Sequence, residues 1–317
     1  MDIQTSAEPE KNNSFWASKK HSRKLLIFAS VAFLGIICLF IILHRTFLTP
    51  DQFYVAAFIF VLITGQVKSF VWDWTPAVLL IFSYEYLRGL IPQINHHVHF
   101  GLMPKFDLLI FHTIPASYLQ SKFYVANHLH WYDYASVGLY LMHFVVPMMV
   151  AFVFWETDRR YFKQYMAGIV TLSFLTFLTY LLFPAAPPWL ASQQGLIPHT
   201  EHITNIILGH FFNYVSIPTV YQYFGVNLVA AVPSLHAAYP LLTALYVGKK
   251  QPKLIPLLIF YVLAVWFAVM YLGEHYFFDV VLGSIYALVV YVVTQRVKDY
   301  REKRHAQKLA KNNLQTI

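Results

Sequence analysis

Eight long apolar runs, separated by polar segments, constrain the fold of this 317-residue chain more than any other feature of its sequence. A helix needs about 20 apolar residues to cross the hydrocarbon core of a bilayer, and several of the runs approach that length. Lipid offers no partner to backbone N–H and C=O groups, so a run that spans it must satisfy them internally as a helix. We therefore predict an all-α fold, a polytopic transmembrane bundle of about six core helices and about two N-terminal spans. The runs cover residues 25–43, 54–67, 76–92, 135–155, 163–183, 234–248, 254–272 and 276–295.

The composition agrees with a membrane environment and excludes some partners. Charged residues make up 12% of the chain, about half the share of a typical soluble domain. The formal charge of +8 comes from basic residues at the two termini and in short loops rather than from one patch. We therefore expect no nucleic-acid partner. Cys38 is the single cysteine of the sequence, so no internal disulfide can form.

The basic residues also predict the orientation of the helices, because lysine and arginine concentrate in cytoplasmic loops. With the N-terminus inside, 19 of the 23 lysines and arginines fall on the cytoplasmic side. An even number of spans then places both termini in the cytoplasm. We predict a multi-pass integral protein of the plasma membrane, with the long connections 93–134 and 184–233 on the non-cytoplasmic face.

Two short polar clusters interrupt the apolar sequence toward the predicted outer side. In the first, Ser234 and His236 follow Pro233 at the start of the sixth run. A helix N-terminus there presents free backbone N–H groups and a dipole that favour an anion. In the second cluster, His275 and Asp279 are four residues apart, so on a helix they share one face.

The histidine–aspartate pair suits nucleophilic chemistry. A carboxylate bonded to one ring nitrogen fixes the tautomer of the imidazole and raises the nucleophilicity of the other nitrogen. Asp279 lies within apolar sequence, where an unpaired carboxylate costs a few kcal/mol. We therefore predict that Asp279 pairs with His275 and that the pair is functional.

Together these clusters resemble two motifs of the type 2 phosphatidic acid phosphatase superfamily, whose members are membrane lipid phosphatases and phosphotransferases. Its Pro-Ser-Gly-His motif corresponds to residues 233–236, and its histidine followed four residues later by aspartate corresponds to His275 and Asp279. The resemblance covers about residues 180–290. Leu235 stands where the motif has glycine, and Val269 stands where an arginine is usual.

In these departures the chain resembles the inositol phosphorylceramide synthase branch of the superfamily, whose members are inositolphosphotransferases. The usual first motif, a lysine followed at a distance by Arg-Pro, is missing. In its place the chain carries Phe-Pro-Ala-Ala-Pro-Pro-Trp at residues 183–189 and Tyr-Glu-Tyr-Leu-Arg-Gly at residues 84–89.

The resemblance implies a role for each site residue. His275 is expected to attack phosphorus and form a phosphohistidine, and Asp279 to orient it. His236 is expected to protonate the leaving alkoxide and then to deprotonate the acceptor, while Ser234 binds phosphate oxygens. For the phosphate charge we favour Arg88, at the outer end of the third span; its alternative partner is Glu85, three residues earlier.

The predicted function is therefore that of a membrane-embedded enzyme, a phosphoric ester hydrolase or phosphotransferase, that cleaves a phosphoester of a lipid-linked substrate on the non-cytoplasmic face. The acceptor is water or an alcohol; transfer of a phospho-head group to a lipid alcohol, as in inositol phosphorylceramide synthase, is the alternative. Histidine supplies the nucleophile and fixed cations supply the electrostatics, so we expect no metal or organic cofactor. Two further alternatives remain open: a haem protein with His236 and His275 as axial ligands, and a proton-coupled transporter.

Other histidines and the domain boundaries complete the sequence-based predictions. No cysteine or well-spaced carboxylate completes a metal site with the histidines at 96, 97 and 99. We assign His128, His130 and Asp133 to the membrane interface rather than to a second triad. Thr75 and Pro76 predict the start of the third span. The predicted parts are a cytoplasmic basic tail at 1–24, accessory spans at 25–72, a phosphatase-like or phosphotransferase-like catalytic domain at 73–297, and a cytoplasmic basic tail, expected to be mobile, at 298–317.

Overall fold

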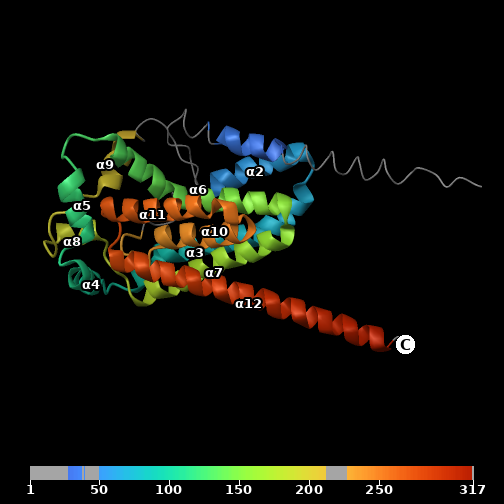
Figure 1. The fold of residues 1–317 in the computed structure, drawn as a ribbon. Coiled ribbons are helices and arrows are strands. Elements are labelled where there is room, and N and C mark those ends of the chain that lie inside the picture. The colour runs from blue at the N-terminus through green and yellow to red at the C-terminus, as the bar shows by residue number, and fades with distance from the viewer. Residues whose placement is uncertain (1–27, 38, 40–49, 212–226, 316–317) are drawn as a thin grey trace, which may run out of the picture.

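The computed structural model describes residues 28–37, 39, 50–211 and 227–315 (Figure 1). These residues form helices joined by loops and contain no strand; the extended segments meet only in isolated bridges between His99, Ala185 and Ala230. The all-α prediction is confirmed. The predicted tail 1–24, and much of the first predicted span, lie outside the described residues.

Each of the eight predicted spans coincides, at least in part, with a helix. The first corresponds to the helical stretch Phe28–Ile37. The other seven correspond to α2, α3, α6, α7, α10, α11 and α12. The helices are α2 (Pro50–Thr64), α3 (Val67–Ile94), α4 (Leu102–Phe111), α5 (Pro115–Phe123), α6 (Trp131–Thr157), α7 (Arg159–Leu182), α8 (Pro188–Gln193), α9 (Ile203–Phe211), α10 (Leu235–Lys250), the short η3 (Pro252–Leu254), α11 (Ile255–Tyr271) and α12 (Phe277–Gln315).

Several of these helices fit an integral membrane protein. Among the described residues, four are long and apolar enough to span a bilayer: Trp131–Thr157, Arg159–Leu182, Pro252–Tyr271 and Phe277–Asn312. The predicted sixth span, α10, has 16 residues, so it is about 24 Å long and shorter than a hydrocarbon core of about 30 Å.

Two boundaries differ from the prediction. α3 begins at Val67 rather than at Pro76, which lies inside the helix. A proline removes one backbone hydrogen bond, but the flanking turn is held by Trp74, which stacks on Phe70 at 5.3 Å between ring centroids and contacts Phe162 at 5.0 Å. Packing therefore carries the helix through the proline. α7 ends at Leu182, ahead of Pro184, as predicted.

The C-terminal segment is helical, which the sequence analysis did not predict. α12 continues through residues 298–315 and ends at Gln315. Lysine, arginine, glutamate, glutamine and alanine dominate this stretch, and all have high helix propensity. A segment that is too polar to enter lipid can therefore still extend a helix beyond it.

α10 is central to the bundle, because it packs against α6, α7, α11 and α12. Lipid tails are as apolar as core side chains, so close packing and hydrogen bonds between helices supply much of the specificity. The hydroxyls of Tyr165 and Thr243 are 2.8 Å apart, and those of Ser173 and Tyr239 are 2.6 Å apart. Fully buried aromatic side chains fill the remaining core, among them Trp74, Trp155, Tyr84, Tyr165 and Tyr246.

The two ends of the bundle differ in character. At the end where α10 begins, α4, α5, α8 and α9 gather, while the C-terminal part of α12 projects beyond the other end (Figure 1). At that other end Asp73 pairs with Arg159 and Lys163, each at 2.8 Å. The two long connections meet at the first end, where the His99 N–H donates to the Pro184 carbonyl at 2.8 Å. They lie together, as the orientation argument requires; the side of the membrane remains a prediction.

Candidate active site

The start of α10 is held tightly by its neighbours. Ser234 caps the helix: its Oγ accepts the Ala237 N–H at 3.2 Å, as short hydroxyl side chains do at helix N-termini. The Pro233 carbonyl accepts the Tyr180 hydroxyl at 2.7 Å. The Ser234 N–H donates to the carbonyl of Asp279 on α12 at 3.0 Å. The first cluster of the sequence is therefore bonded directly to the second.

A glycine allows α12 to approach this closely. A Cβ placed on Gly283 would overlap the Ser234 carbonyl oxygen, far inside van der Waals contact. Gly283 is one turn beyond Asp279 on α12, so the same face of the helix carries the acidic residue and the contact surface. The close contact between α10 and α12 therefore lies on the same side of α12 as the Asp279 side chain.

The loop between α11 and α12 delivers the second histidine. Gly273 has φ of 81°, and a Cβ there would lie 2.6 Å from the Glu201 carbonyl oxygen, so the turn requires glycine. The backbone N–H groups of Glu274 and His275 both donate to the Val269 carbonyl, at 3.1 and 3.2 Å. This turn ends α11 and presents the His275 side chain at the entrance to α12.

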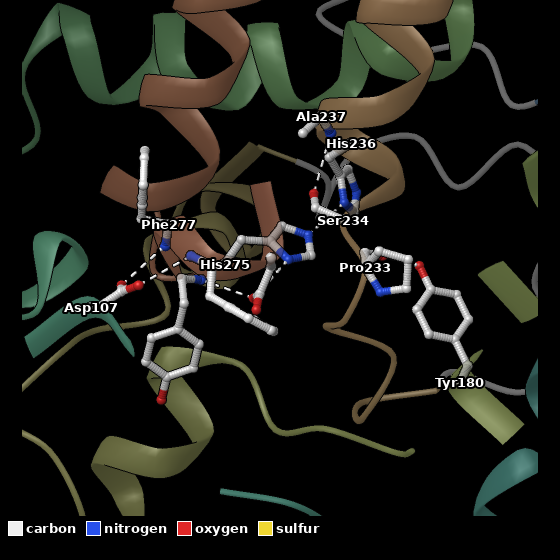
Figure 2. A network of polar contacts seen from close by, with 11 residues as sticks. Asp107, Tyr180, Pro233, Ser234, His236, Ala237, His275 and Phe277 are labelled. Carbon is white, nitrogen blue, oxygen red and sulfur yellow. Dashed lines mark hydrogen bonds and ion pairs between the residues drawn. The ribbon is translucent and has the colours of Figure 1, made fainter. Parts of the chain in front are cut away.

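Three ionisable side chains then form one line. His275 Nδ1 is 3.3 Å from Asp279 Oδ2. His275 Nε2 is 2.9 Å from His236 Nδ1, and these two histidines face each other in Figure 2. Asp279 is fully buried and also accepts the Tyr276 N–H at 2.9 Å. Since a carboxylate accepts at Nδ1, the hydrogen-bond network assigns the proton of His275 to Nδ1 and leaves a lone pair on Nε2.

The separation of the two histidines bears on the haem alternative. A distance of 2.9 Å between the ring nitrogens is that of a direct hydrogen bond. Two ligands on opposite sides of one metal, each bonded at about 2 Å, would instead have their nitrogens about 4 Å apart. The described residues contain no group of three or more histidine, cysteine or carboxylate side chains arranged to hold a metal ion.

α6 supplies two aromatic side chains that the sequence reasoning did not assign to the site. The Tyr140 ring stacks on the His236 ring, with centroids 4.4 Å apart and planes at 20°. The centroid of the His143 ring lies 4.0 Å from that of the His236 ring, and His143 Nδ1 is hydrogen-bonded to the Tyr140 carbonyl. The available signal was a histidine deep in an apolar run with a tyrosine three residues before it, on the same helical face.

Arg88 makes the ion pair that the sequence offered as its alternative. Its Nη2 and Nε lie 2.9 and 3.0 Å from Glu85 Oε2, and Glu85 is buried. The Arg88 carbonyl accepts from the side-chain amide of Asn227 at 3.0 Å, which ties this part of α3 to the chain just before α10. A role for Arg88 in phosphate binding stays a prediction.

Comparison with known families now adds to this geometry. A family model described as the PAP2 superfamily matches residues 107–293, which contain both histidines and the aspartate. The chain belongs to the PAP2 superfamily. The resemblance to type 2 phosphatidic acid phosphatases is confirmed.

Curated proteins resemble the chain over about half of its length. It is 30% identical over 174 residues to the phosphoinositol dihydroceramide synthase of Bacteroides thetaiotaomicron, covering 52% of this chain and 57% of that protein. It is 32% identical over 162 residues to the catalytic subunit of inositol phosphorylceramide synthase of Saccharomyces cerevisiae, covering 49% and 40%. The inositol phosphorylceramide synthase of Candida albicans is 26% identical over 176 residues, covering 54% and 36%.

These relatives confirm the predicted similarity to the inositol phosphorylceramide synthase branch. The chain covers less than two thirds of the length of each of them. No solved structure matches the chain significantly.

Two of the outer histidines of this PAP2 member, His202 and His130, have partners in the loops and helix ends. His202 Nε2 is 3.0 Å from Glu274 Oε1, and its ring stacks on Trp189 at 4.4 Å. Asp133 accepts the His130 N–H at 2.6 Å, which caps α6, and also accepts the Tyr271 hydroxyl. These contacts join the outer loops to the ends of α6 and α11 rather than to the His236–His275 pair.

Proposed function

We propose that this chain is a membrane-embedded lipid phosphotransferase or phosphatase that works through a phosphohistidine at His275. The observation that carries the proposal is the line of Asp279, His275 and His236, with 3.3 Å and 2.9 Å between successive polar atoms. Membership of the PAP2 superfamily supports chemistry on phosphate esters.

In the first step the Nε2 lone pair of His275 attacks phosphorus, and the bond from phosphorus to the leaving oxygen breaks as the new P–N bond forms. His236, in its protonated imidazolium form, gives a proton to the leaving alkoxide, which departs as an alcohol and leaves His236 neutral. Asp279 stabilises the positive charge that develops on the His275 ring. The substrate phosphoryl group must enter between the two histidines and replace their direct hydrogen bond.

In the second step the acceptor reverses this path. Neutral His236 takes the proton of the acceptor O–H, the acceptor oxygen attacks phosphorus, and the P–N bond breaks to return the free His275. Water as acceptor gives hydrolysis, and an alcohol gives transfer. The relatives are named for phosphoinositol and ceramide products, so we propose a phosphoinositol-bearing lipid as donor and a ceramide-like alcohol as acceptor.

Phosphate charge is balanced at the N-terminus of α10. The first N–H groups of a helix have no intrahelical acceptor, and here they follow Ser234 next to His236. Ser234 Oγ accepts from Ala237, which leaves the hydroxyl hydrogen to donate to a phosphate oxygen. Arg88 is the proposed fixed cation. Because the basic residues favour the opposite end as cytoplasmic, we propose that the site opens to the non-cytoplasmic face of the plasma membrane.

The test uses the full chain, purified and reconstituted in lipid vesicles with phosphatidylinositol as donor, with and without a ceramide. Wild type is compared with His275→Ala and with His97→Ala, a matched loss of an exposed histidine outside the site. We expect head-group release or transfer in wild type and in His97→Ala, and loss by at least about 1000-fold in His275→Ala, the scale of losing a nucleophile. Product that forms only with ceramide identifies a transferase. Equal activity of the wild type and His275→Ala would contradict the proposal.

A further inference from the structure

We infer that Asp107, on α4, is a positioning residue for His275, because it holds the first turn of α12 in the place that aligns His275 with Asp279. The inference rests on the proposed function. It concerns a residue on an outer helix, well separated in sequence from either histidine motif, and its side chain is fully buried.

The geometry is that of a helix cap supplied by another helix. Asp107 Oδ2 accepts the Phe277 N–H and Oδ1 accepts the Phe278 N–H, each at 3.0 Å. These are the first two N–H groups of α12, which have no acceptor within the helix. An acidic group at a helix N-terminus also meets the positive end of the helix dipole. In Figure 2 Asp107 lies on one side of His275, and Ser234 and His236 lie on the other.

The backbone after His275 is therefore fixed at three consecutive residues. The Tyr276 N–H donates to Asp279 Oδ2, and the next two N–H groups donate to Asp107. Without the Asp107 carboxylate, these two part-buried N–H donors would lose their acceptors, which is unfavourable. The first turn of α12 would shift to find new partners, and Asp279 lies on that turn. The pairing of His275 Nδ1 with Asp279 would then be misaligned.

Charge makes this cap sensitive to pH. Burial raises the pKa of the Asp107 carboxyl to about 6, and the charge of Asp279 contributes to the rise. The groups that face Asp107 from the α12 side are Asp279, the Tyr276 side chain and the two amides; Lys105, on α4 itself, is exposed. Ionised, the carboxylate accepts from both amides. Protonated below pH 6, one of its oxygens carries hydrogen and is a poorer acceptor, so the cap weakens.

The experiment measures kcat and KM for Asp107→Asn and Asp107→Ala in the reconstituted assay. Asp107 has no contact with the phosphoryl group in the proposed reaction, so we expect kcat to fall on the order of 10- to 100-fold while KM stays within about twofold. Asparagine keeps one acceptor oxygen and should lose less than alanine. The ratio of wild-type to Asp107→Asn kcat should be largest above pH 7 and fall toward pH 5, because wild type loses its charged cap there and asparagine has none to lose.

Asp158→Ala is the matched control. Asp158 caps α7 at the far end of the bundle, where its Oδ1 accepts the Tyr161 N–H at 3.1 Å. We expect this variant to lower the melting temperature and to leave kcat and its pH profile unchanged. The inference is overturned by wild-type kcat in a folded Asp107→Asn, or by the same kcat loss in Asp158→Ala. If Asp107→Ala does not fold, the isosteric asparagine variant decides. Full activity of His275→Ala overturns the proposed function instead.

Discussion

At the scale of single residues, contacts from two parts of the chain hold the ring of His236 in place. Its Nδ1 bonds His275 at 2.9 Å, while Tyr140 and His143 hold its ring from α6. Stacked aromatic pairs of this kind contribute about 0.5–1.5 kcal/mol. We interpret them as support for an acid that must meet the leaving oxygen at one angle.

Tyr140→Leu tests that interpretation through the leaving group. In the proposed reaction an alkoxide leaves with a proton from His236, whereas a p-nitrophenolate leaves without one. We expect Tyr140→Leu to lower kcat about 3- to 10-fold for an alkyl phosphodiester, the kinetic equivalent of the stacking energy. The rate for the matched p-nitrophenyl ester should change little, while His275→Ala abolishes both. Equal losses on the two esters would mean that Tyr140 acts on something other than the acid.

At the scale of secondary-structure elements, the contact between α10 and α12 sets the distance between the two motifs. Gly283→Ala places a methyl group well inside van der Waals contact with the Ser234 carbonyl oxygen, a backbone atom that cannot rotate away. The helices must separate, and overpacking of this kind costs about 1–3 kcal/mol. We expect a lower melting temperature and a clear loss of kcat.

Gly138→Ala, on α6, provides the comparison, since a Cβ there meets nothing within 4 Å. Alanine in a helix interior is more stable than glycine by about 0.5–1 kcal/mol, so this variant should keep its activity and melt no earlier than wild type. A Gly283→Ala chain that behaves like Gly138→Ala would show that the two helices are not held at this separation.

The same scale shows what sequence can predict. The positions of the helices that coincide with the eight apolar runs follow from those runs, whereas α4, α5, α8 and α9 have no counterpart among them. The meeting of His236 with His275 follows from two short motifs. The start of α3 did not follow, because aromatic packing around Trp74 outweighs the proline signal. Asp107 and His143 were missed because their roles come from contacts with segments about 90 to 170 residues away. For Asp107 the only local signal was a lone carboxylate in the apolar stretch of residues 106–114.

At the scale of the whole molecule, the site and the charged network around Asp73 occupy opposite ends of one bundle. α10 carries Ser234 at its start and ends at Lys250, which pairs with Asp158. The basic extension of α12 leaves the bundle at that second end (Figure 1). Lysine and arginine favour the cytoplasmic side, so this arrangement predicts a cytoplasmic C-terminus and an active site that faces away from the cytoplasm.

Cysteine labelling in intact cells tests the orientation directly. Cys38→Ala removes the single native thiol, after which His97→Cys reports on the site end and Lys303→Cys on the exposed helical extension. A membrane-impermeant maleimide should label His97→Cys at once and Lys303→Cys only after the membrane is permeabilised. The reverse pattern would turn the site toward the cytoplasm. The donor and acceptor lipids would then have to come from the inner leaflet, and the charge bias would need another explanation. Retained head-group transfer in both variants shows that the labelled chains are folded.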